Sequence, residues 1–241
     1  MIKKLWLSIP RYIRVIIWLT FINLGILAVR NLWLGNQVFS FLKSNLFIGS
    51  LPPLVIAMII GKYYPKMHNF LFWFLTGLWV LFYPNAPYMI SDLIHDSSDP
   101  LDKLNPEIIV FDTLIIFSIA MLSIFYGLVS LKIMFAVFQK KYNYKFACVA
   151  TGITLLLSCL GFYMGREIAS AVKLGNGYLY SWEIFLEPFQ IVKSVLQMLF
   201  PISTHKEAWA MMVLFGLVQY MLLIIFRDVS DTESSAFLNE K

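Results

Sequence analysis

Charged side chains are scarce in this chain. They make up 14% of its 241 residues, against about 25% in a typical soluble domain. A chain this poor in charge cannot cover a water-facing surface with polar groups. Hydrophobic residues make up 59% and come in long runs, such as 155–165 and 211–226, which contain no charge. The composition excludes a soluble helical protein and predicts an integral membrane protein.

Cysteine and short catalytic motifs are also rare. The only two cysteines, Cys148 and Cys159, lie in one apolar segment. In a helix they would be about 16 Å apart, too far for a disulfide, so we interpret them as small core residues. The sequence contains no nucleophile elbow, phosphate-binding loop, Cys-x-x-Cys pair or zinc-protease motif. The sequence therefore contains none of these motifs of known hydrolases and redox enzymes.

Six hydrophobic segments are present, and they predict an all-α polytopic bundle of about six transmembrane helices. They cover residues 12–30, 38–60, 70–95, 106–138, 146–166 and 205–226. The apolar stretch 182–200 contains Glu183 and Pro188, so we expect it to lie in the membrane interface before the last span. Residues 1–226 would form one transmembrane domain, and 227–241 a polar cytoplasmic tail.

The basic residues indicate how the bundle is oriented. The net charge is +5, but the lysines and arginines lie mostly between hydrophobic segments, so we expect no nucleic-acid partner. In a six-helix arrangement four basic segments fall on one side, which should be the cytoplasm, together with both chain ends. Their residues are Lys3, Lys4, Arg11, Arg14, Lys62, Lys66, Lys140, Lys141, Lys145 and Arg227.

Prolines interrupt two of the six segments. Pro52 and Pro53 predict a kink in the second. In the third, helix over 70–83 would be about 21 Å long, short of the roughly 30 Å hydrocarbon core, before the sequence Pro84-Asn85-Ala86-Pro87. Broken backbone at membrane depth needs protein or water around it and often lines a site. The alternative is that the prolines end one helix and start an interfacial one.

Ionisable side chains gather at the predicted outer side. Asp92 and His95 are three residues apart and share a helix face. Asp112 would lie about 9 Å inside the fourth helix, where an acid normally has a partner or a function. Asp92, His95 and Asp112 are a candidate set for one divalent metal ion, or for moving protons. The alternatives are an interfacial histidine for His95 and a structural ion pair between Asp112 and Arg166.

Several stretches resemble a known family. They are Leu81-Phe-Tyr-Pro-Asn-Ala-Pro-Tyr88, Asp92-Leu-Ile-His95, Phe111-Asp112, Gly161-Phe-Tyr-x-Gly-Arg166 and Ser181-Trp182-Glu183 with Pro188. Together they resemble the bacterial integral-membrane family catalogued as domain of unknown function 1361. Members tend to have Asn-Ser-Trp-Asp where this chain has Tyr180-Ser-Trp-Glu183. The resemblance implies a multi-pass protein of the bacterial cytoplasmic membrane and implies no activity.

Three functions are compatible with these features. The first is an outward-facing hydrolase or transferase acting on a lipid or lipid-linked envelope substrate. Asp92, His95 and Asp112 would be catalytic or bind metal, and Asn85, Arg166 and Glu183 would bind substrate. The second is a small transporter or channel subunit lined by the broken helix. The third is a non-catalytic partner in a membrane assembly. In each case membrane lipids are the expected surroundings and partners.

Overall fold

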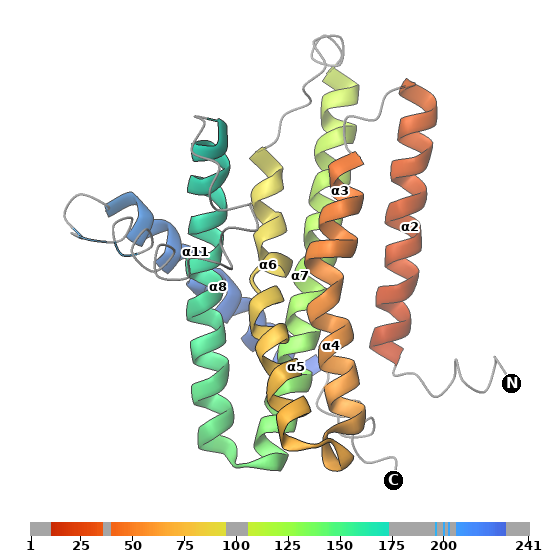
Figure 1. Ribbon diagram of the computed structural model, residues 1–241. Coiled ribbons are helices and arrows are strands. Elements are labelled where there is room, and N and C mark those ends of the chain that lie inside the picture. The colour runs from red at the N-terminus through yellow and green to blue at the C-terminus, as the bar shows by residue number, and fades with distance from the viewer. Residues whose placement is uncertain are drawn as a thin grey trace, which may run out of the picture.

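The computed structural model describes residues 11–35, 40–94, 106–173 and 206–229, with single positions 196, 200 and 202. Within these residues every regular element is helical. The α-helices are α2 (Arg11–Leu34), α3 (Ser40–Ser44), α4 (Leu51–Tyr63), α5 (Asn69–Phe82), α6 (Asn85–Tyr88), α7 (Pro106–Lys141), α8 (Tyr144–Lys173) and α11 (Lys206–Val229). A π-helix, η1 (Asn45–Ser50), and two 3-10 helices, η2 (Tyr64–Lys66) and η3 (Met89–Ile94), complete the described chain (Figure 1).

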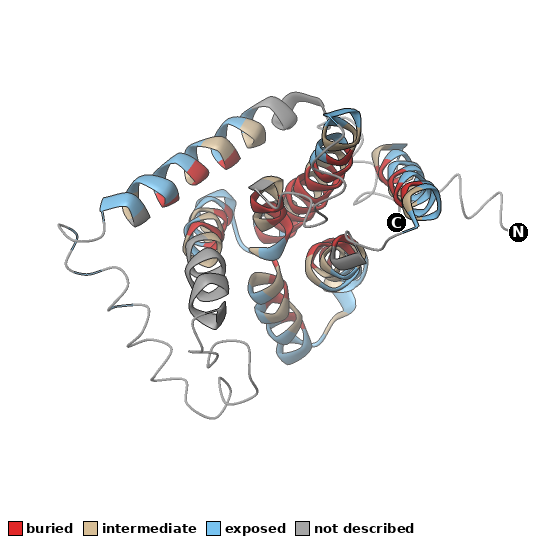
Figure 2. Ribbon diagram, turned by 90° about the horizontal axis from the view of Figure 1, so that it is seen from above, coloured by how far each residue is buried: buried red, intermediate tan, exposed pale blue. Residues whose placement is uncertain are grey.

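Four helical stretches are long and apolar enough to cross a membrane. They are Arg11–Leu34, Leu42–Lys66, Pro106–Lys141 and Tyr144–Phe162. Their outward faces carry large apolar side chains, including Trp18 and Phe21 of α2, which are 61% and 64% exposed. A lipid-facing surface has this character, and Figure 2 shows the buried residues turned inward. The predicted all-α membrane bundle is confirmed.

The other two predicted spans, the third and the sixth, are not among these four stretches. The third is divided into α5, α6 and η3, as the proline pattern predicted. The last, α11, has an apolar core of Trp209–Ile224 and crosses the other helices obliquely, packed mainly against α8 (Figure 1). The expected interfacial helix over 182–200, except for positions 196 and 200, lies outside the described residues, as does most of the tail.

Helix α7 is the centre of the bundle. It packs against α2, α4, α8 and all parts of the broken helix region, and it supplies much of the buried core. At 36 residues it is about 54 Å long, so it extends beyond the hydrocarbon core. Figure 1 shows the start of α2, the α4–α5 connection and the α7–α8 turn together at one end of the bundle. We call this end the basic end. The opposite end carries Asp92, Glu107 and Asp112, and we call it the acidic end.

The proline pair in the second span disturbs the helix just before it. Pro52 and Pro53 have no N–H to donate, and their rings crowd the carbonyls four residues earlier. The chain forms the π-helix Asn45–Ser50 there and returns to an α-helix at Leu51. A π-helical turn is rare, and it interrupts the regular bonding of an α-helix as a proline does. The disturbance predicted at the prolines is therefore a change of helix type.

The break in the third span is enclosed by protein. Ala86 and Pro87 are buried, and the Ser123 hydroxyl of α7 donates to the Ala86 carbonyl at 2.6 Å. Backbone irregularity in a membrane is stable only where such groups replace the lost helix bonds. Glycines allow the close approach: a Cβ added at Gly127 would lie 3.3 Å from the Ala86 Cβ, and one at Gly161 only 2.7 Å from the Pro84 Cβ.

Gly161→Ala should therefore destabilise the protein. The new methyl would overlap a rigid proline ring, which we expect to cost about 1–3 kcal/mol of unfolding free energy. The matched control is Gly152→Ala on the same helix, where an added Cβ meets nothing within 4 Å. Thermal unfolding in detergent should give a lower Tm for Gly161→Ala and an equal or higher Tm for Gly152→Ala. Equal Tm values for both variants would contradict this packing.

Candidate functional site at the acidic end

Asp112 is held by an arginine that the sequence pattern did not single out. The Arg30 guanidinium donates from Nε to Oδ1 at 2.9 Å and from Nη2 to Oδ2 at 2.7 Å. The two side chains are 0% and 3% exposed. This is the two-pronged geometry in which arginine binds a carboxylate most strongly. Both oxygens of Asp112 are therefore occupied inside the bundle.

The alternative of a structural ion pair for Asp112 is supported, but with a partner other than the Arg166 that the sequence suggested. An intramembrane acid was rightly expected to have a basic partner, but that partner is Arg30 of α2. Arg166 lies in α8, and its side chain is outside the described residues. Arg30 was placed at the outer end of the first span as a boundary residue. The signal in the sequence was the apolar stretch Leu32-Trp33-Leu34 after Arg30, over which α2 continues, so that Arg30 lies about 6 Å inside the helix.

The ion pair belongs to a longer contact between α2 and α7. More than one helix turn toward the basic end, the Thr20 and Tyr126 hydroxyls are 2.6 Å apart. Beyond the ion pair on the other side, the rings of Trp33 and Phe111 meet edge to face with centroids 6.0 Å apart. Because α2 packs chiefly against α7, these contacts fix the position of the first span.

Asp92 is buried at the end of the broken helix. It is 2% exposed and accepts a hydrogen bond from the Asn45 side-chain amide at 3.1 Å. Asn45 begins the π-helix, so this bond joins the two irregular segments of the bundle. Next to Asp92, the Ser91 hydroxyl is buried and has no hydrogen-bond partner among the described residues. Asn45 and Ser91 were not among the predicted site residues, because neither sits in a recognisable motif.

The remaining predicted residues do not all join this cluster. Asn85 is exposed, and its Cβ lies beside Gly49 of the π-helix. His95 and Glu183 lie outside the described residues, so the proposed Asp92, His95 and Asp112 metal set stays a prediction. Within the described ranges, no three histidine, cysteine or acidic side chains come together as a metal site. As a ligand, Asp112 would first have to leave Arg30.

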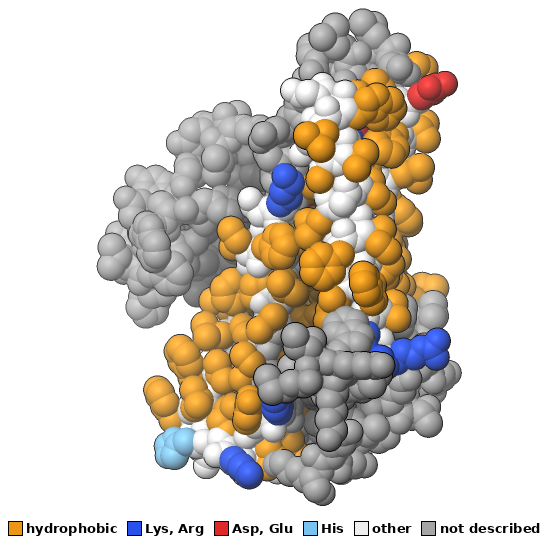
Figure 3. Space-filling view, turned by 90° about the vertical axis from the view of Figure 1, so that its right-hand side faces the viewer, with side chains coloured by type: hydrophobic (Ala, Val, Ile, Leu, Met, Phe, Trp, Pro, Cys, Tyr) orange, Lys and Arg blue, Asp and Glu red, His pale blue; other side chains and the backbone are white. Residues whose placement is uncertain are grey.

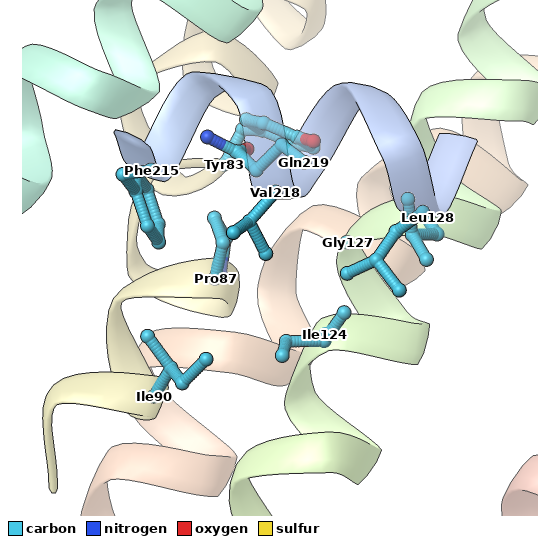
Figure 4. Close-up of a pocket in the computed structure, with 10 residues that line it drawn as sticks. Tyr83, Pro87, Ile90, Ile124, Gly127, Leu128, Phe215, Val218 and Gln219 are labelled. Atoms are coloured by element: carbon cyan, nitrogen blue, oxygen red, sulfur yellow. The ribbon is translucent and has the colours of Figure 1, made fainter. Parts of the chain in front are cut away.

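A pocket lies elsewhere, between the broken helix, α7 and α11 (Figure 4). Its cavity volume is only about 10 Å³, and its apolar walls include Pro87, Gly127 and Phe215. Gln219 also lines it, but the Ser158 hydroxyl donates to its Oε1 at 3.1 Å and its Nε2 lies 3.7 Å from the Cys159 sulfur. The lining includes no charged side chain. This pocket suits packing or apolar groups better than acid–base chemistry.

Long apolar helices, a protein-enclosed helix break and buried polar pairs define this chain as a helical multi-pass membrane protein. Comparison with known families then places it more narrowly. A family model described as "Protein of unknown function (DUF1361)" matches residues 44–222, so the chain belongs to that family. No curated protein and no solved structure matches it. The match includes the broken helix, Asp92 and Asp112, whereas Arg30 precedes it.

Asp112→Asn should be far more destabilising than the loss of an exposed acid. The amide keeps the size of the side chain but removes the negative charge that the buried Arg30 guanidinium contacts at 2.7 Å, and breaking a buried ion pair in this way costs about 3–5 kcal/mol. The control is Glu207→Gln at the exposed start of α11, which should cost less than about 1 kcal/mol. Chemical unfolding of both purified variants measures the difference. Similar losses would show that the ion pair does not hold α2 in place.

Proposed function

We propose that the protein is a non-catalytic component of an assembly in the bacterial cytoplasmic membrane, with both chain ends in the cytoplasm. The observation that carries this proposal is the closed Arg30–Asp112 pair. A catalytic or metal-binding acid needs an oxygen that substrate, water or metal reaches, whereas the Asp112 side chain is 3% exposed and each of its oxygens accepts a hydrogen bond from Arg30. The most deeply placed acid of the cluster thus serves to join helices.

The surface of α2 supports the same proposal. This helix is covered mainly on its α7 side, and large side chains such as Trp18, Phe21 and Trp33 stay exposed. In a membrane these faces meet lipid or other helices. A span attached at one side by a strong polar contact leaves most of its surface for such neighbours.

The test compares the parent with Arg30→Met/Asp112→Leu and with Asp112→Leu alone. Each tagged chain is expressed in cells that lack the parent, extracted in mild detergent and run on native gels. The parent and the double variant should migrate in the same complex, larger than the detergent-bound 27.9 kDa monomer. In the double variant apolar side chains replace both partners and keep the helices packed. Asp112→Leu alone removes the carboxylate that Arg30 contacts, so this variant should lose the complex. A monomeric parent would contradict the proposal.

A second candidate rests on Asp92. A buried carboxylate beside the helix break, held by Asn45 and next to the Ser91 hydroxyl, suits an outward-facing metal-assisted or acid–base enzyme. In that proposal Asp92 and His95 bind metal or move protons on a lipid or lipid-linked substrate. Asn85, Arg166 and Glu183 contact the substrate.

Bound metal separates the two candidates. The purified parent is compared with Asp92→Asn and His95→Ala by elemental analysis after supplementation with divalent metals. The enzyme candidate predicts about one metal ion per chain in the parent and loss of it in both variants. Metal-free parent protein, or metal that both variants retain, would remove the metal mechanism, and the enzyme candidate would then require acid–base catalysis alone.

A further inference from the structure

The basic end carries two turns that are rich in lysine. The α4–α5 connection contributes Lys62, Lys66 and His68, and the start of α8 contributes Lys145. Segments 62–69 and 140–145 contain no acidic residue. Lys62, Lys66 and Lys145 are all exposed. Figure 3 shows basic side chains near this end and an acidic side chain at the opposite one.

These two turns form one surface. Lys141, the last residue of α7, donates from Nζ to the Asn69 side-chain oxygen at 3.3 Å, and Asn69 begins α5. The same Nζ lies 4.7 Å from the centre of the Phe72 ring, within cation–π range. Lysines from parts of the chain about 75 residues apart are thereby brought together. Their mutual repulsion favours a shared anionic partner.

Aromatic side chains place this surface at the edge of the membrane. Trp73 stacks on Tyr142 with ring centroids 5.9 Å apart, and Tyr142 lies 4.6 Å from Phe146. Next to them Phe70 and Phe74 stack along the outside of α5 and are 74% and 53% exposed. Tryptophan and tyrosine mark the level of lipid head groups, and Phe74, one helix turn further into α5 than Phe70, faces the tails.

We propose that the basic turns at 62–69 and 140–145 bind the phosphate head group of an anionic phospholipid. Charge complementarity selects a negative ligand, and basic sites between helices at this level typically hold such head groups. The exposed Phe70 and Phe74 rings give the acyl chains an apolar surface to lie on. This combination favours a lipid over a soluble phosphate, which would use the lysines alone.

Native mass spectrometry of the full chain in detergent tests the proposal. The protein is titrated with phosphatidylglycerol and, separately, with phosphatidylcholine of the same acyl chains. The variant Lys66→Gln/Lys145→Gln removes two exposed charges from the surface, and Lys43→Gln/Lys206→Gln removes two from elsewhere. The parent should prefer phosphatidylglycerol. The first variant should bind it about tenfold more weakly or worse, while the second stays close to the parent.

Thermal unfolding of both variants without added lipid checks that the fold is kept, since neither Lys66 nor Lys145 packs in the core. Equal binding by the two variants, or equal binding of the two lipids by the parent, would overturn the proposal. Displacement of the bound lipid by millimolar inorganic phosphate would also overturn it, because the surface would then be a site for soluble anions.

Discussion

Two short hydrogen bonds between the Arg30 guanidinium and the Asp112 carboxylate join the first helix to the rest of the molecule. Removing two charges from water is costly, and only close, two-pronged geometry offsets that cost. In lipid the alternative is worse, because either residue alone would be a charge without a partner inside the hydrocarbon. The position of α2 therefore depends on this pair together with close packing, because interhelical hydrogen bonds and van der Waals contacts are what hold helices together in a bilayer.

The helix break imposes the second constraint. Pro84 and Pro87 interrupt the third span, and the freed backbone must be satisfied inside the bundle. Gly127 and Gly161 let α7 and α8 approach it, and Ser123 bonds to the Ala86 carbonyl. The same arrangement carries η3 to the acidic end and buries Asp92 there. The polar residues at that end are thus positioned by backbone geometry that the prolines require.

Local features of the sequence predicted much of this structure. Apolar runs located the long helices, and the Pro-Asn-Ala-Pro stretch located the break, because both depend on residues next to each other in the chain. The partner of Asp112 could not be predicted in this way. Helix periodicity shows which residues share a face, but it does not show which helix that face meets. Arg30 and Arg166 were both basic residues near the outer ends of spans, and only the packing of α2 on α7 decided between them.

Packing also explains the remaining differences. The obliquely placed α11 and the π-helix before Pro52 arise from how helices fit together and how a proline pair is accommodated. Gly161 belongs to one of the stretches that resemble the family, and the surface that approaches it is Pro84 of the broken helix. Single-sequence reasoning identified the positions where close packing occurs and left their partners open.

Exchanging the two charged residues tests most directly whether their attraction holds the bundle together. Unfolding free energies are measured for the parent, Arg30→Asp, Asp112→Arg and the exchange variant Arg30→Asp/Asp112→Arg. A structural ion pair predicts that the exchange variant recovers most of the stability lost in either single variant, because the attraction is restored with opposite polarity. Losses that simply add in the exchange variant would show that the two side chains contribute independently, and their attraction would then not be what holds α2 against α7.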